Sequence, residues 1–162
     1  MRRTLILSVV MMSLAATFST PVAAREAPTR RVPLVAVGRL SIEKLNVDVT
    51  IYKGVTEREF DRGVGYWPGS ALPGDLGNMV IGGHRTSAHR PFYDIQKLKV
   101  GDIIVVTRPQ HTVRYRVTRK LIVKPTDLWI IQPTPTPSLT LFTCHPRGSV
   151  SKRYAVRATL VE

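Results

Sequence analysis

The sequence is poor in several residue types, and each shortage excludes a class of protein. Its 162 residues include one cysteine, so the chain can form neither an internal disulfide nor a zinc site built from several thiolates. Eleven acidic residues face 24 lysines and arginines, which leaves a net charge of +13. No basic stripe interleaved with aromatic residues is present, so we expect no nucleic-acid partner. A chain of this length also leaves little room for a second domain, which argues against Rossmann enzymes and kinases.

The N-terminus carries a long uncharged run. Arg2 and Arg3 precede the largely apolar residues 4–24, which end on Val22-Ala23-Ala24. This order is typical of a cleaved secretory signal. As a helix the run would be about 31 Å long, so it also suits a membrane anchor with its cationic end inside. Both interpretations stay open, and both place the rest of the chain outside the cytoplasm, either anchored to the membrane or secreted.

The remainder divides into a short tether and one domain. Residues 25–37 combine four charges with two prolines and no clear periodicity, so we expect a tether there. Residues 38–162 form the expected catalytic domain. Its turn-rich composition, with most of the chain's 12 prolines and 11 glycines, favours short strands over a helical bundle.

The strand signals predict a mainly β fold. In the clearest hairpin, the second arm alternates Val113, Tyr115 and Val117 with polar residues, which indicates one buried and one solvated face. No internal repeat is visible. The pattern predicts a closed β-barrel of seven or eight strands with one or two short helices. The expected strands are 39–42, 47–52, 78–81, 103–107, 112–123, 139–144 and 153–161, the expected helical turns are 56–61 and 91–98, and 63–77 is expected to be loop.

The single cysteine is the first candidate for chemistry. Cys144 ends the alternating run 139–144 and opens directly into a loop. A lone cysteine in an exported protein is either a buried filler or a nucleophile, and a strand end facing a loop favours the nucleophile.

A catalytic thiol needs a proton-transfer partner, and four histidines compete for that role. His145 adjoins Cys144, so strand alternation is expected to point its ring to the opposite face. His111 lies in a hairpin turn and His89 in a loop, where both are expected to be solvated. His84 follows an apolar strand and two glycines that permit close backbone approach. His84 is therefore the favoured acid–base candidate, and the alternative of a loop histidine whose ring is satisfied by backbone groups stays open at this point.

An oxyanion needs a fixed cation, and arginine is suited to this because it is always charged and forked. Arg153 opens the strand that follows Cys144. A loop between antiparallel strands would bring it back beside the thiol.

These residues carry a resemblance to the sortase family. Thr140-Leu-Phe-Thr-Cys144-His-Pro, with Lys152-Arg153-Tyr-Ala-Val after it, is similar to the sortase signature Thr-Leu-x-Thr-Cys with a downstream arginine. Gly82-Gly83-His84-Arg85-Thr86 resembles the histidine motif of that family. The likeness extends from about Val37 to Val161, and the Thr-Cys-His-Pro variant resembles class E sortases of actinobacteria most closely.

The resemblance implies a cysteine transpeptidase on a sortase-type barrel. Cys144 would attack the Thr–Gly bond of a C-terminal sorting signal of the Leu-Pro-x-Thr-Gly or Leu-Ala-x-Thr-Gly type. His84 would act as general acid and base, and Arg153 would stabilise the oxyanion and hold the substrate backbone. Thr143 would contribute a further oxyanion donor. A peptidoglycan-precursor or pilin amine would accept the client protein, and no cofactor is needed.

Three alternatives compete with this interpretation. An L,D-transpeptidase-like crosslinker lacks support because its Ser-His-Gly-Cys stretch is missing. A non-catalytic envelope-binding module with a relic cysteine would share the fold without the reaction. A metal site on Cys144 and His84 would have too few protein ligands, and the acidic residues look too scattered for a calcium site, so no metal is expected.

Overall fold

The computed structural model describes residues 32–87 and 89–161. The expected signal or anchor over residues 1–24, and the tether up to residue 31, lie outside the described residues. Within the described part of the chain, no helix is both long and apolar enough to cross a membrane.

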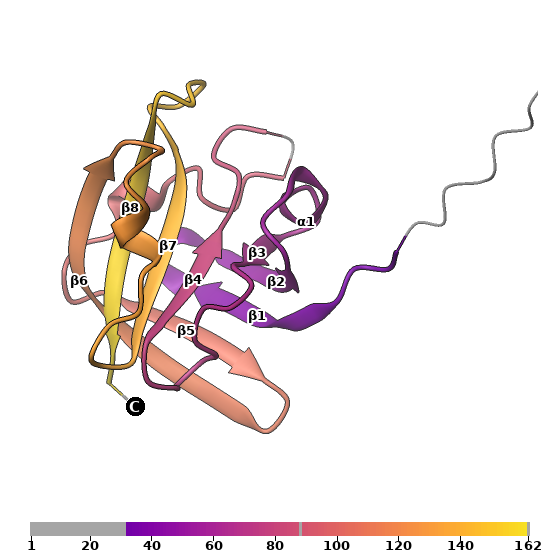
Figure 1. Cartoon of the computed structure of the whole chain (residues 1–162), viewed down its shortest axis with the longest axis vertical. Helices are drawn as coiled ribbons and strands as arrows, with labels where there is room; N and C mark the ends of the chain where they lie inside the picture. The colour runs from indigo at the N-terminus through magenta and orange to yellow at the C-terminus, as the bar shows by residue number, and fades with distance from the viewer. Residues whose placement is uncertain (1–31, 88, 162) are drawn as a thin grey trace, which may run out of the picture. The chain divides into compact units, whose positions relative to one another are not determined.

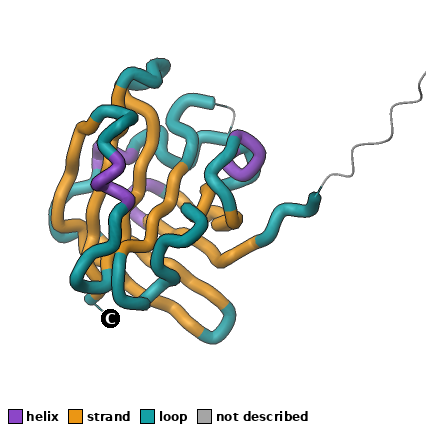
Figure 2. Tube along the Cα trace, viewed as in Figure 1, coloured by secondary structure: helices purple, strands orange, loops and turns teal. Residues whose placement is uncertain are grey.

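Eight strands close into a barrel, with one α-helical turn and three 3-10 turns between them (Figures 1 and 2). The mainly β fold and the closed barrel predicted from the sequence are therefore confirmed. The strands are β1 (Ala36–Ile42), β2 (Val47–Lys53), β3 (Val64–Tyr66), β4 (Asn78–Gly82), β5 (Ile103–Arg108), β6 (His111–Val123), β7 (Ser138–His145) and β8 (Lys152–Leu160). The helical elements are η1 (Glu43–Leu45), α1 (Glu57–Phe60), η2 (Ile95–Lys97) and η3 (Leu128–Ile131).

The strand order around the barrel is β1-β2-β3-β4-β7-β8-β6-β5. Most neighbours are antiparallel, but β2 pairs with β3 and β4 pairs with β7 in parallel. The parallel pairing of β4 and β7 brings the carboxyl ends of both strands to the same end of the barrel. The beginning of β8 meets them there, because β8 runs antiparallel to β7.

The barrel interior is filled by apolar side chains from all eight strands. In β6, Val113, Tyr115 and Val117 are buried while the residues between them are exposed, as the alternation predicted. A second, smaller apolar cluster lies on the outer face of the sheet. It is built on Val123, Ile130 and Ala155, with Phe142 packed against it.

Three short elements depart from the sequence-based expectation, and one of them is the 3-10 turn η1, where only a bend between two strands was expected. The segment 63–77 contains the short strand β3, and residues 128–131 form η3, where no element was expected. In β3, a Cβ on Gly65 would lie 2.2 Å from the carbonyl oxygen of Gly54. Glycine is therefore required for the parallel pairing at this point, although glycine in a strand usually weakens it.

Candidate active site

The cysteine and the arginine singled out in the sequence face each other across one ladder. Cys144, near the end of β7, pairs directly with Arg153 near the start of β8. Directly opposite residues of an antiparallel pair point to the same face of the sheet. The thiol and the guanidinium therefore stand on the same face. Both residues are partly exposed, so solvent and a substrate can reach them.

His84 reaches the other side of Cys144 through the β4–β7 pairing. Gly82 is opposite Phe142 in the parallel ladder, and the amide of Gly83 donates to the carbonyl of Phe142 at 3.2 Å. Two residues further along each chain come His84 and Cys144. Continued past the end of β4, the register therefore directs His84 toward the side of Cys144 that lies opposite Arg153.

Two glycines let the chain carrying His84 run close to its neighbours. A Cβ on Gly82 would lie 2.5 Å from the ring of Phe142, and one on Gly83 would lie 2.9 Å from the ring of Phe92. Such separations are not compatible with a side chain. The two glycines therefore make room for the aromatic rings of Phe142 and Phe92, whereas a close approach of another backbone at this pair stays a prediction.

Thr143 points away from the face of the sheet that carries Cys144. Its side chain is buried, and its hydroxyl donates to the carbonyl of Gly83 at 2.7 Å. Successive residues of a strand point to opposite faces. In this orientation the hydroxyl ties β7 to the segment before His84, whereas the sequence resemblance implied an oxyanion donor at this residue.

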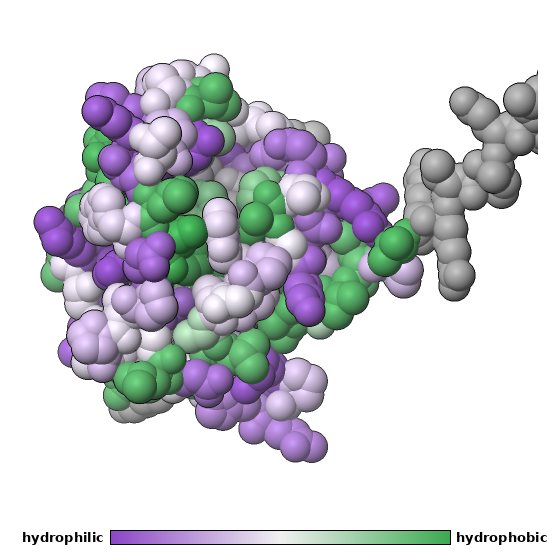
Figure 3. All heavy atoms as spheres, viewed as in Figure 1, coloured by the Kyte–Doolittle hydropathy of each residue, from purple (hydrophilic) through white to green (hydrophobic). Residues whose placement is uncertain are grey.

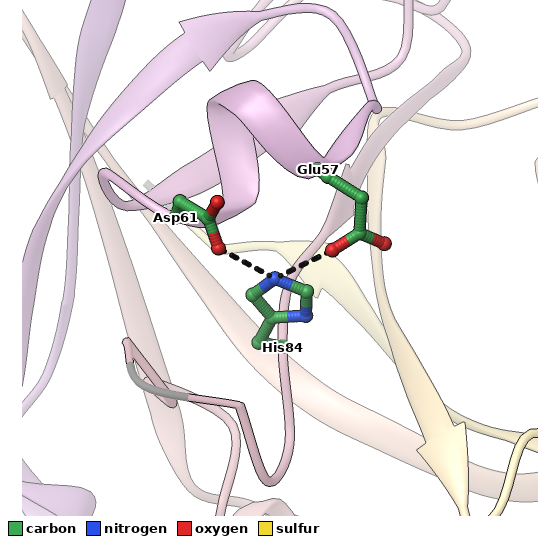
Figure 4. A group of neighbouring side chains, drawn as sticks. All are labelled: Glu57, Asp61 and His84. Carbon is green, nitrogen blue, oxygen red and sulfur yellow. Dashed lines mark hydrogen bonds and ion pairs between the residues drawn. The ribbon is translucent and has the colours of Figure 1, made fainter.

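The imidazole of His84 is held by two carboxylates that the sequence analysis did not connect with it (Figure 4). Its Nε2 lies 3.1 Å from Glu57 Oε2 and 3.2 Å from Asp61 Oδ1. The ring also meets Phe60 edge-on, with centroids 5.5 Å apart. Glu57 and Asp61 are four residues apart, which puts them on one face of a helical turn. That spacing is the only sequence signal that points to the pair.

The acidic residues are therefore less scattered than the sequence suggested. Glu57, Asp61 and His84 carry donor atoms of metal-binding type within 4.8 Å of one another. In this arrangement the imidazole Nε2 has Asp61 as its hydrogen-bond partner and the carboxylate of Glu57 within ion-pair distance, so its polar requirement is met within the group.

Of the remaining histidines, His89 is partly buried in its loop, so it is less solvated than expected. His145 faces away from the Cys144 side, and its Nδ1 lies 2.7 Å from Arg85 Nη1. Burial, with the nearby positive charges of Arg85 and Lys152, lowers the pKa of His145. His111 is exposed on the β5–β6 hairpin, as expected.

Arg85 forms a buried link between the histidine segment and β7, a role for which the sequence carried no signal. Its Nη1 donates to the carbonyl of Cys144 at 3.2 Å, and its Nη2 donates to Gln96 Oε1 at 2.8 Å. The guanidinium lies 5.6 Å from the centroid of the Tyr154 ring. Burial and the charge of Arg147 lower the pKa of Arg85, and its buried Nε has no hydrogen-bond partner among the residues that the structure describes.

Arg153 lies beside a small apolar groove. Its Nη1 donates to the carbonyls of Val150 and Lys152, at 2.8 and 3.0 Å. A cavity of about 100 Å³ opens next to it, between η3 and the outer face of β7. The groove is this cavity, which is lined by Trp67, Lys124, Pro125, Asp127, Leu128, Ile130, Ile131, Phe142 and Arg153. On the face of the molecule shown in Figure 3, apolar residues are scattered among polar ones.

The fold and these side chains define a β-barrel protein with a partly exposed cysteine directly opposite an arginine, and with a histidine just after the strand that pairs with the other side of β7. A family model described as the sortase domain matches residues 40–161. The chain belongs to the sortase family.

Individual relatives agree with this assignment. Sortase SrtE1 of Streptomyces coelicolor is 32% identical over 139 residues, covering 76% of this chain and 40% of that protein. Sortase D of Bacillus subtilis is 30% identical over 125 residues, covering 75% of this chain and 62% of that protein. The solved structure of sortase A from Corynebacterium diphtheriae superposes with a TM-score of 0.76 at 32% identity, covering 82% of this chain and 63% of that chain. The chain thus spans less than two thirds of the length of these relatives.

Proposed function

We propose that this protein is a cysteine transpeptidase that cleaves a C-terminal sorting signal between Thr and Gly and transfers the client protein to an amine. The observation that carries the proposal is the direct pairing of Cys144 with Arg153 in a sortase-family barrel whose β4, parallel to β7, leads directly to His84. We take the signal to be of the Leu-Pro-x-Thr-Gly or Leu-Ala-x-Thr-Gly type.

The first half-reaction forms a thioester. Cys144 passes its thiol proton to His84, and the resulting thiolate attacks the carbonyl carbon of the signal's Thr, whose carbonyl oxygen becomes an oxyanion. Arg153 is directly opposite Cys144, which suits its guanidinium to stabilise that charge and to bind the substrate backbone. When the C–N bond breaks, the departing Gly amine takes a proton from the imidazolium of His84. The product is an acyl-enzyme and a released C-terminal peptide.

The second half-reaction resolves the thioester. An incoming amine attacks the same carbonyl carbon while neutral His84 accepts its proton. The thiolate of Cys144 leaves, and a new amide bond joins the client to the acceptor. A peptidoglycan precursor or a pilin lysine would supply the amine. Every step uses groups of this chain and its two substrates.

The groove beside Arg153 supports the choice of substrate. It opens on the same face as Cys144, and Phe142 lies two residues before the thiol on that face. Trp67 meets Phe142 edge-on, with centroids 6.2 Å apart, and Ile130 and Leu128 close the other side. An apolar wall of this kind suits the leading Leu of a sorting signal better than a charged residue.

The proposed reaction belongs to the cell envelope. The apolar residues 4–24 support export, whether they are removed as a signal or kept as a membrane anchor. The clients are exported proteins that carry the signal near their C-termini. Fractionation of cells that express the full chain would separate the two forms, because only an anchored chain sediments with membranes.

The test uses a fluorogenic sorting peptide with the purified protein. We expect wild type to cleave it between Thr and Gly and to form an acyl-enzyme detectable as a mass increase on Cys144. Cys144→Ala should keep the thermal unfolding transition and lose both signals. Cleavage by the alanine variant at the wild-type rate would contradict the nucleophile assignment. Absence of turnover in wild type, over a panel of both signal types with an added amine, would favour a non-catalytic binding module.

A further inference from the structure

Glu57, which opens α1, and Asp61, which directly follows it, are not among the residues that contact the substrate in the proposed reaction. We propose that Glu57 and Asp61 are positioning residues that hold Nε2–H of His84 and thereby leave Nδ1 as the nitrogen that exchanges protons. The inference rests on the proposed function, because the two acids have a catalytic purpose only if His84 transfers protons.

The geometry indicates that the two carboxylates hold the His84 ring in place and are not a chance pair of surface acids. Both carboxylates approach the same ring nitrogen, at 3.1 and 3.2 Å, from one helical turn (Figure 4). The His84 side chain is 10% exposed, whereas those of Glu57 and Asp61 are 83% and 60% exposed. The imidazole is thus fixed in the protein, and the acids reach inward to it from the surface.

A local capping arrangement orients the turn that carries the acids. The carboxylate of Glu59 accepts hydrogen bonds from the amide and the hydroxyl of Thr56, at 3.0 and 2.5 Å. This is a capping box, which closes the first turn of a helix. Glu59 itself is buried, so it faces the barrel while Glu57 and Asp61 project toward His84. Phe60 packs edge-on against the ring from the same turn.

Hydrogen-bond chemistry then decides which nitrogen is free. A carboxylate only accepts hydrogen bonds, so Nε2 must carry a hydrogen to satisfy either acid. A neutral imidazole carries one hydrogen, and with Nε2 protonated the lone pair is on Nδ1. Among the described residues no hydrogen bond engages Nδ1. Both charge states of the ring keep Nε2–H, and the proton that moves during the reaction is the one on Nδ1.

This arrangement follows the logic of a catalytic triad, in which an acid fixes the tautomer of the base. The acids here are exposed, so each contact is screened by solvent and weaker than a buried one. Two weak contacts on one atom still restrict the ring, because rotation about its side chain would break both. We expect the pair to contribute about tenfold to kcat, the lower end of the effect of partners that orient a histidine.

The experiment compares three double variants in which two acids are changed. Glu57→Ala with Asp61→Ala removes both carboxylates, whereas Glu57→Gln with Asp61→Asn keeps an acceptor oxygen at each site without the charge. Glu43→Ala with Asp75→Ala is the matched control, because it makes the same change of charge at two other exposed acids. Thermal unfolding confirms that each variant folds.

Two readouts separate positioning from general stability. The first is the nitrogen NMR spectrum of the His84 ring at a pH where the ring is neutral, recorded in Cys144→Ala protein so that it does not depend on turnover. We expect wild type, the Gln/Asn variant and the control to show the Nε2–H tautomer, and the alanine pair to show a mixture of tautomers. The second is peptide turnover, where the alanine pair should lose about tenfold in kcat with KM unchanged.

The outcomes are distinct. If the tautomer of His84 is unchanged in the variant with Glu57→Ala and Asp61→Ala, the two acids do not set it, whatever the turnover, and the proposal is wrong. A changed tautomer with kcat equal to that of the control would overturn the catalytic role of these acids. Rescue to within about threefold of wild type by the Gln/Asn variant would support hydrogen bonding as the cause. If wild type turns over no sorting peptide, the proposed function fails and the catalytic role fails with it, while the ring spectrum still decides whether the acids set the tautomer.

Discussion

Cys144 and Arg153 are directly opposite each other in the β7–β8 ladder, nine positions apart in the chain and adjacent in the sheet. The same ladder pairs Thr140 with Arg157, whose Nε donates to the Thr140 hydroxyl at 3.3 Å. Arg157 also donates to the carbonyl of Ile130 and so fastens η3 to the sheet. Two arginines on one face of β8 thus have different surroundings: Arg153 borders the thiol, and Arg157 supports the wall of the groove.

Arg153→Lys tests the need for a forked donor beside the thiol. Lysine keeps the charge but cannot offer the planar donor pair of a guanidinium. We expect kcat/KM on a sorting peptide to fall about 100-fold, the scale of losing one oxyanion donor. Arg116→Lys, at an exposed position of β6, is the control and should stay within about twofold of wild type. Equal losses in the two variants would mean that only the overall positive field matters.

Histidine choice can be tested with a pair of substitutions. His84→Ala should lower kcat/KM by about 100-fold or more, the usual effect of removing a general acid–base residue. His145→Asn keeps an acceptor for Arg85 and should cost less than about tenfold, because the ring faces away from the thiol. The measurement is kcat/KM for both variants on one peptide. A larger loss in His145→Asn would reverse the assignment of the two histidines.

The lowered pKa of His145 predicts that the stability of the fold depends on pH. Burial and the charges of Arg85 and Lys152 lower its pKa, so the unfolded chain binds this proton more readily than the folded protein does. Stability therefore falls as the pH drops through the ordinary histidine pKa of about 6.5 and toward the lowered value. Urea unfolding at pH 7.5 and pH 5 should show a smaller loss for His145→Asn than for wild type. An equal loss in both proteins would exclude His145 as a source of this dependence.

Glu59 is expected to contribute to stability at neutral pH. The hydroxyl of Thr56 donates to its carboxylate and lowers the pKa of Glu59. A lowered carboxyl pKa stabilises the fold above the ordinary value of about 4.3, and the contribution is lost as the pH falls through the folded value. Glu59→Gln should therefore reduce the free energy of unfolding by about 1 kcal/mol at pH 7 and by less at pH 3. Glu43→Gln serves as the control, and a difference independent of pH would contradict the ionic origin.

Elements with a clear periodicity were predictable from the sequence. The alternation of Val113, Tyr115 and Val117 identified β6 and its buried face, and Thr56 with the following acids identified the turn at α1. Short elements without such a pattern were missed. β3 has three residues and a central glycine, and η3 is a single turn whose position depends on contacts with Arg157 and Asn78.

By itself the sequence determined the residue types available for chemistry: one thiol at a strand end, a histidine after two glycines and an arginine opening the next strand. It also determined the alternation that turns His145 away from Cys144, since neighbouring residues of a strand face opposite sides. The tertiary structure alone decided that β4 runs parallel to β7. This pairing joins the segments of His84 and Cys144, and the hydrogen bond from Thr143 to Gly83 spans 60 positions of the chain. It also decided that Glu57 and Asp61 meet Nε2 of His84. Local sequence patterns encode which face a residue takes, whereas contacts between distant segments depend on the register of strands that only the closed barrel sets.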